Sequence, residues 1–105
     1  MPSPVNLGPA DAIPDGGCRA FLLPFGPVVV FRRGGSYHAL KNACPHNDEP
    51  FHMGKTDGDT VICPGHAWRI DLSTGETDQG PRARTYAIEV RDGSLILFPD
   101  RSGVT

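Results

Sequence analysis

The stretch CPHNDEPFHMGKTDGDTVICPGHAW, residues 44–68, contains two of the three cysteines and three of the four histidines in the chain. Two short blocks in it each pair one cysteine with one histidine, Cys44-Pro-His46 and Cys63-Pro-Gly-His66, and sixteen residues separate them. Thiolate and imidazole groups are common ligands of zinc and of iron–sulfur clusters. The spacing therefore predicts a metal site built from two parts of one stretch.

Two cysteines and two histidines can bind a single zinc ion as a tetrahedron. They can also bind a [2Fe-2S] cluster, with both cysteines on one iron and both histidines on the other. Structural zinc fingers usually pair cysteine with cysteine and histidine with histidine. Here each block carries one residue of each kind, so two loops on opposite sides of a two-iron cluster could each supply one ligand to each iron. The pattern favours the cluster and leaves a zinc-stabilised structural module as an alternative.

The length of 105 residues fits a single domain, which we place at residues 1–105. The formal net charge is −2 and the basic residues are scattered, so we expect neither a nucleic-acid partner nor a membrane partner. The longest apolar run, residues 28–31, is far too short to span a bilayer. The N-terminus shows no signal-peptide pattern and three cysteines do not suggest a disulfide framework, so we expect a cytoplasmic protein.

Short apolar runs separated by glycine and proline predict short strands joined by turns. Tyr86, Ile88 and Val90 alternate with other residues at the two-residue period of a half-buried strand. Asp92-Gly93 favours a tight hairpin turn. No segment shows a helical period, so we predict an all-β fold, a small barrel or sandwich. The expected strands are residues 19–23, 27–33, 36–42, 60–63, 68–71, 84–90 and 94–98.

The two blocks follow the expected strands 36–42 and 60–63, so they fall on loops at about residues 43–54 and 62–70. In this context the chain resembles the Rieske-type iron–sulfur proteins, whose motif is CxH-x(16–17)-CxxH. AWRIDLSTG at residues 67–75 matches the segment that follows the second block in this family, and Gly80-Pro81 matches the proline loop that covers the cluster. Phe51 stands where the family usually has leucine, and it should still cap the cluster with an apolar group.

The resemblance implies one [2Fe-2S] cluster per chain, held by two loops that form a cluster-binding subdomain of a small Rieske-like barrel. It implies that Cys44 and Cys63 ligate the buried iron, and that His46 and His66 ligate the outer iron. It also implies a one-electron carrier, a soluble Rieske ferredoxin that transiently contacts a flavin-dependent reductase and a terminal oxygenase.

Such a carrier is not itself an enzyme. The chain ends soon after the last expected strand, so we expect no second domain with a catalytic mononuclear iron. An alternative within the same fold is the small subunit of an NAD(P)H-dependent nitrite reductase. Many of those subunits have lost cluster ligands, whereas this chain keeps all four.

The departures from the family pattern indicate a low reduction potential. High-potential respiratory Rieske proteins have a disulfide-forming cysteine in each block, where this chain has Glu49 and Gly65. They also have a serine and a tyrosine that donate hydrogen bonds to the cluster, where this chain has Trp68 and Ile70. Fewer hydrogen bonds stabilise the reduced cluster less, so we predict a potential of about −150 mV, near the bottom of the Rieske range.

The remaining candidates have plainer expected roles. We expect Cys18 to be an inert thiol, His38 an ordinary sheet residue and His52 a solvent-exposed loop residue. Residues 47–49, Asn-Asp-Glu, form an acidic segment beside His46. It is either solvated loop or a docking patch for a basic rim on a redox partner, since such charges steer encounter.

Overall fold

The computed structural model describes residues 3–43, 51, 55–63, 69–77 and 82–103. The predicted ligands Cys44, His46 and His66 lie outside these residues, as do the acidic segment 47–49 and residues Gly80-Pro81. The described part consists of nine strands and a short 3₁₀ turn, η1 (Ala10–Ala12). The predicted all-β fold is confirmed.

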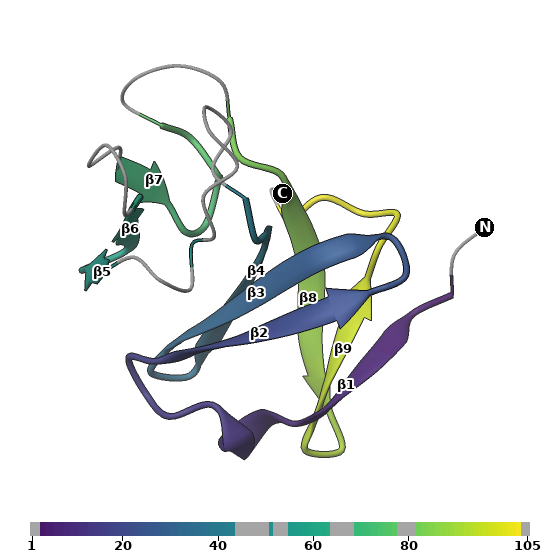
Figure 1. Cartoon of the computed structure of the whole chain (residues 1–105). Helices are drawn as coiled ribbons and strands as arrows, with labels where there is room; N and C mark the ends of the chain where they lie inside the picture. Colours follow the sequence, from purple (N-terminus) through teal and green to yellow (C-terminus); the bar gives the residue numbers. More distant parts are fainter. Residues whose placement is uncertain (1–2, 44–50, 52–54, 64–68, 78–81, 104–105) are drawn as a thin grey trace.

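Six antiparallel strands form the larger sheet, in the order β1-β9-β8-β4-β3-β2, and they curl around each other into an almost closed barrel (Figure 1). Three short strands form a second antiparallel sheet in the order β5-β6-β7. This small sheet is inserted in the chain between β4 and β8 and lies to one side of the barrel (Figure 1). The strands are β1 (Val5–Pro9), β2 (Cys18–Leu23), β3 (Gly26–Arg33), β4 (Ser36–Lys41), β5 (Lys55–Asp57), β6 (Thr60–Ile62), β7 (Arg69–Asp71), β8 (Thr85–Arg91) and β9 (Ser94–Phe98).

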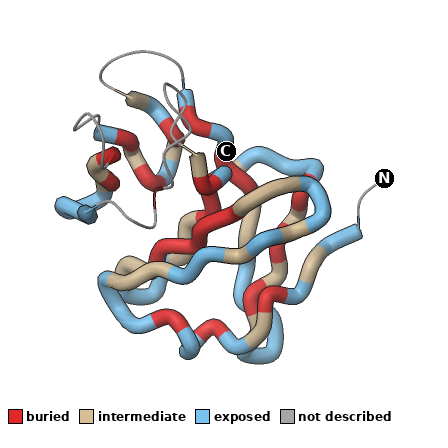
Figure 2. Tube along the Cα trace, in the orientation of Figure 1, coloured by how far each residue is buried: buried red, intermediate tan, exposed pale blue. Residues whose placement is uncertain are grey.

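Strand β3 contributes side chains to two hydrophobic cores, one on each of its faces. Val28 and Val30 pack in the barrel core, with Leu95 and Leu97 of β9 among its members. Val29 and Phe31 pack in a second core that includes residues of the small sheet. Successive residues of a strand face opposite sides, so the uninterrupted apolar run 28–31 reflects burial on both faces. Figure 2 shows buried residues along the middle of β3.

The hairpin between β8 and β9 has the turn that its sequence predicts. Arg91 pairs with Ser94, which leaves Asp92 and Gly93 as the two central residues. Both have positive φ, 52° for Asp92 and 80° for Gly93. Positive φ at both central positions defines a type I′ turn, whose twist matches that of the flanking strands.

Two strands were missing from the sequence prediction, and both lie at an edge of their sheet. Strand β5, Lys-Thr-Asp, is exposed at all three positions and is held by its pairing with β6. Strand β1 has one buried residue, Leu7, and contains Gly8 and Pro9. Short edge strands with little buried surface give only a weak hydrophobic signal in the sequence.

The part of the chain that the structure describes contains no helix long and apolar enough to cross a membrane.

Candidate metal centre

Cys63 directly follows β6 and is 1% exposed. It belongs to the core that joins the two sheets, together with Phe51, which is fully buried. The apolar group predicted at Phe51 therefore lies in the same core as the predicted ligand Cys63. The other members of this core are Val29, Phe31, Leu40, Val61, Ile70, Leu72 and Ala83.

These surroundings fit the charge of an oxidised cluster with this ligand set. Two ferric ions, two sulfides and two thiolates sum to zero, and the imidazoles are neutral. Apolar surroundings strongly disfavour an unpaired charge but not a neutral group. Cys63 packs among apolar side chains of this core, which suits a neutral cluster bound through a cysteine.

The structure describes Cys63 and none of the other three predicted ligands. Within the described ranges, no group of three His, Cys, Asp or Glu side chains could hold a metal ion. The set Cys44, His46, Cys63 and His66 therefore stays a prediction.

The segment that leads into the first block is tied to the barrel by backbone hydrogen bonds. The amide of Lys41 donates to the carbonyl oxygen of Arg84 at 2.9 Å, and the amide of Asn42 donates to that of Pro27 at 3.0 Å. Asn42 is buried. These bonds fix Lys41 and Asn42, which shortly precede Cys44 in the sequence, to the starts of β8 and β3.

A tight turn at residues 71–75 follows β7. One carboxylate oxygen of Asp71 accepts hydrogen bonds from the Ser73 hydroxyl at 2.6 Å and from the Ser73 amide at 2.8 Å. A third hydrogen bond comes from the Thr74 amide at 3.3 Å. These bonds favour the ionised carboxylate and hold the pKa of Asp71 below its ordinary value, with the Ser73 hydroxyl as the largest cause. This turn is the DLSTG segment of the Rieske resemblance.

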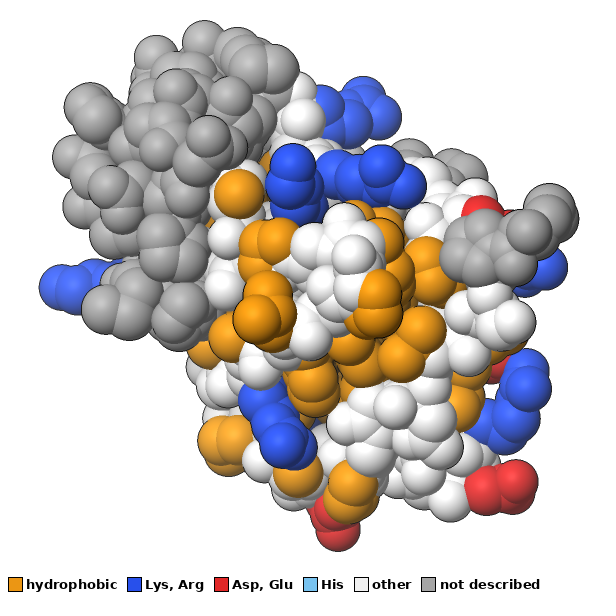
Figure 3. Space-filling view, turned by 45° about the vertical axis from the view of Figure 1, so that its right-hand side comes forward, with side chains coloured by type: hydrophobic (Ala, Val, Ile, Leu, Met, Phe, Trp, Pro, Cys, Tyr) orange, Lys and Arg blue, Asp and Glu red, His pale blue; other side chains and the backbone are white. Residues whose placement is uncertain are grey.

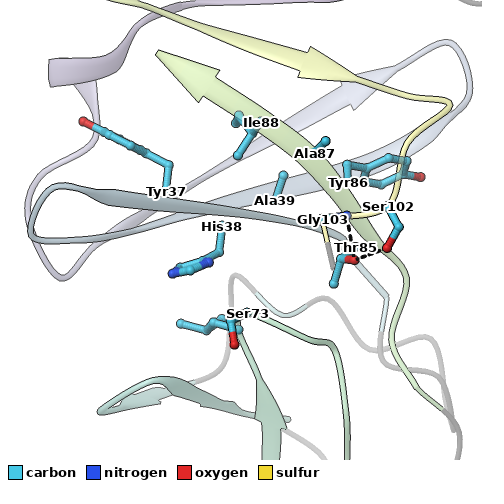
Figure 4. A pocket seen from close by; sticks show the side chains of 11 residues that line it. Tyr37, His38, Ala39, Ser73, Thr85, Tyr86, Ala87, Ile88, Ser102 and Gly103 are labelled. Carbon is cyan, nitrogen blue, oxygen red and sulfur yellow. Dashed lines mark hydrogen bonds between the residues drawn. The ribbon is translucent and has the colours of Figure 1, made fainter. Parts of the chain in front are cut away.

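His38 faces the turn from β4. Figure 4 shows its ring directed toward the segment that carries Ser73, across a cavity of about 200 Å³. Partial burial lowers the pKa of the His38 imidazole, because burial disfavours the charged form. The carboxylates of Asp59 and Asp71 oppose this effect, and Arg33 adds to it. His38 is a residue of strand β4, as expected from the sequence, and it lies between the two sheets.

Cys18 is the first residue of β2 and packs against the core that contains Cys63. Burial raises the pKa of its thiol, which keeps the thiol protonated and unreactive near neutral pH. This agrees with the expected inert role.

A family model described as Rieske [2Fe-2S] domain matches residues 3–101. The 4beta-methylsterol monooxygenase of Methylococcus capsulatus is 31% identical over 85 residues, which cover 69% of this chain and 23% of that protein. The 3-phenylpropionate/cinnamic acid dioxygenase ferredoxin subunit of Escherichia coli is 30% identical over 94 residues, which cover 85% of this chain and 87% of that protein.

Among solved structures, the ferredoxin of carbazole 1,9a-dioxygenase from Nocardioides aromaticivorans IC177 superposes with a TM-score of 0.85 at 28% identity. That superposition covers 94% of this chain and 100% of the other. The chain thus spans less than a quarter of the monooxygenase but most of each ferredoxin.

Proposed function

This chain belongs to the Rieske [2Fe-2S] domain family, and we propose that it is a one-electron carrier, a ferredoxin that serves an oxygenase. A domain of this family holds a [2Fe-2S] cluster. The observation that carries the proposal is the match over 87% of the Escherichia coli ferredoxin subunit. In a carrier of this kind the chain binds the cluster and presents it to partners, and it does not itself bind an organic substrate.

The cluster, when bound, accepts and releases one electron. We assign Cys44 and Cys63 to the inner iron, and His46 and His66 to the outer iron. The described residues support the inner side of this assignment. Cys63 is shielded from water by the core that contains Phe51, and Ile70 in the same core has no side-chain group that could donate a hydrogen bond to a sulfide.

We further propose that a flavin-dependent reductase supplies the electron and that a terminal oxygenase receives it. The two ferredoxins described above are both components of dioxygenases, which supports an oxygenase as the electron acceptor. The proposal that a reductase donates the electron rests on the family resemblance alone. A cytoplasmic location remains part of the proposal, because three cysteines do not suggest a disulfide framework.

Anaerobic purification with assays of iron, sulfide and zinc tests the proposal, combined with visible and EPR spectra before and after reduction by dithionite. We expect a red-brown protein with two irons and two sulfides per chain, and an EPR signal of low average g after reduction. A colourless protein with one zinc ion would overturn electron transfer and leave the zinc-stabilised module. Co-purification with a large flavin- and siroheme-containing chain would instead identify a nitrite reductase subunit.

A further inference from the structure

Three arginines line a groove beside the start of β8. Arg82 and Arg84 are exposed on either side of the buried Ala83, and Arg101 reaches the same groove from the segment after β9. The groove has a volume of about 380 Å³, and Asp100 also contributes to its lining. Figure 3 shows Lys and Arg side chains gathered on the upper part of one face, above an apolar area.

Aromatic rings hold two of these arginines in place. The guanidinium of Arg84 lies over the ring of Tyr86, at 5.1 Å from the ring centroid, and that of Arg101 lies over Phe98 at 5.0 Å. Nη2 of Arg84 also donates to the carbonyl oxygen of Pro99 at 3.4 Å. Side chains that are already ordered lose less conformational entropy when they bind a partner.

The groove carries excess positive charge, although the whole chain has a net charge of −2. Arg82 pairs with Glu76 at 3.3 Å, in an exposed contact that contributes little to stability. Within the described residues, neither Arg84 nor Arg101 lies within ion-pair distance of a carboxylate. A guanidinium stacked on a ring still presents its N–H groups for two-point binding of a carboxylate.

The groove borders the candidate metal centre. Ala83, between Arg82 and Arg84, packs in the core that contains Cys63. A protein surface seated on the groove would therefore lie close to the core that contains the predicted inner ligand Cys63.

We propose that this arginine groove, Arg82, Arg84 and Arg101, is a docking site for a redox partner whose surface presents carboxylates. The inference rests on the proposed function, because it assumes electron transfer to or from the docked protein. The positive charge of the groove favours a partner with an acidic rim over one with a basic rim.

The test uses holo-protein reduced by dithionite and two haem proteins as probes, the acidic cytochrome b5 and the basic cytochrome c. The variant R84E/R101E replaces two positive charges of the groove by negative charges. The control R19E changes an exposed arginine on β2 that likewise lies over an aromatic ring, Phe21, at 5.2 Å. Strands β4 and β3 separate β2 from β8 within the sheet.

At low ionic strength, we expect R84E/R101E to reduce cytochrome b5 about tenfold more slowly than the wild type, and R19E to stay within about twofold. Added salt should slow the wild type and abolish this difference. The neutral variant R84Q/R101Q should reduce cytochrome b5 at a rate between those of the wild type and R84E/R101E. This variant keeps the test valid if the charge-reversed protein misfolds. The rate with cytochrome c should not decrease.

Equal slowing by R19E, or equal slowing with both haem proteins, would overturn the docking site. A separate NMR titration of the wild type with hexaglutamate does not depend on electron transfer, and it should shift the Nε–H signals of Arg84 and Arg101. No shift, or an equal shift with inorganic phosphate at the same concentration, would also overturn it. Absence of the cluster spectrum would refute the proposed function. The peptide titration would then still show whether the groove binds carboxylates.

Discussion

The backbone amide of Ala83 donates a hydrogen bond of 2.7 Å to the carbonyl oxygen of Gly75. The two segments approach so closely that a Cβ atom at Gly75 would lie 2.3 Å from the carbonyl oxygen of Ala83. Gly75 also has a φ of +78°, a conformation that is unfavourable for other residues. Because Ala83 packs in the core with Cys63, this contact fixes one wall of the candidate metal centre to the turn at residues 71–75.

Replacing Gly75 by alanine should therefore destabilise the protein. We expect Gly75→Ala to lower the free energy of unfolding by about 3 kcal/mol, from the clash and the left-handed conformation together. Gly58→Ala is the matched control, because Gly58 has a φ of 58° and open space around it. It should cost only about 1 kcal/mol. Urea unfolding measures both, and equal losses would show that the close approach to Ala83 is unimportant.

Replacing Cys63 by serine should remove the cluster, because a predicted thiolate ligand is lost at a buried position. We expect Cys63→Ser to purify without visible absorption and with almost no iron. Cys18→Ser is the control, since Cys18 is half-buried against the same core and is not a predicted ligand. It should keep two irons per chain. Retention of the cluster spectrum in Cys63→Ser would contradict the ligand assignment.

His38 should make stability depend on pH. Its pKa in the folded protein is below the ordinary value of about 6.5, so the unfolded chain binds the proton more readily. The resulting stability is complete above pH of about 6.5 and is lost as the pH falls toward the lower folded-state pKa.

The variant His38→Gln should remove part of this decline. Urea unfolding at pH of about 7.5 and about 5.5 measures it, and the stability difference between the two pH values should be smaller in the variant. The other three histidines contribute equally to both proteins, so they cancel in the comparison. An unchanged difference would mean that the junction between the sheets tolerates a charged imidazole.

The reduction potential should be low. Ile70, which stands where high-potential members have a hydrogen-bonding tyrosine, is fully buried in the core with Cys63. Without that donor the reduced cluster is stabilised less, and we expect a midpoint potential of about −150 mV. Spectroelectrochemical titration measures it directly. A clearly positive potential would mean that other groups donate hydrogen bonds to the sulfides.

The sequence alone was sufficient to predict the fold class, the family and most of the strands. The run 28–31 and the alternation in 84–90 predicted β3 and β8, because burial in a sheet repeats over neighbouring residues. The spacing of the two Cys–His blocks predicted the kind of metal centre, because each block places one thiol and one imidazole close together in the sequence. Local chemistry and local periodicity carry this information without any knowledge of the tertiary structure.

Only the tertiary structure brought Arg84 and Arg101 to one groove and placed His38 opposite Ser73. It also determined that Gly75 and Ala83 meet too closely for a side chain. Strand β5, which has no buried side chain, is likewise specified by its pairing with β6. These relationships join residues with no common periodicity, and they depend on how strands pair and pack in the folded chain. A single sequence contains no local signal for contacts of that kind.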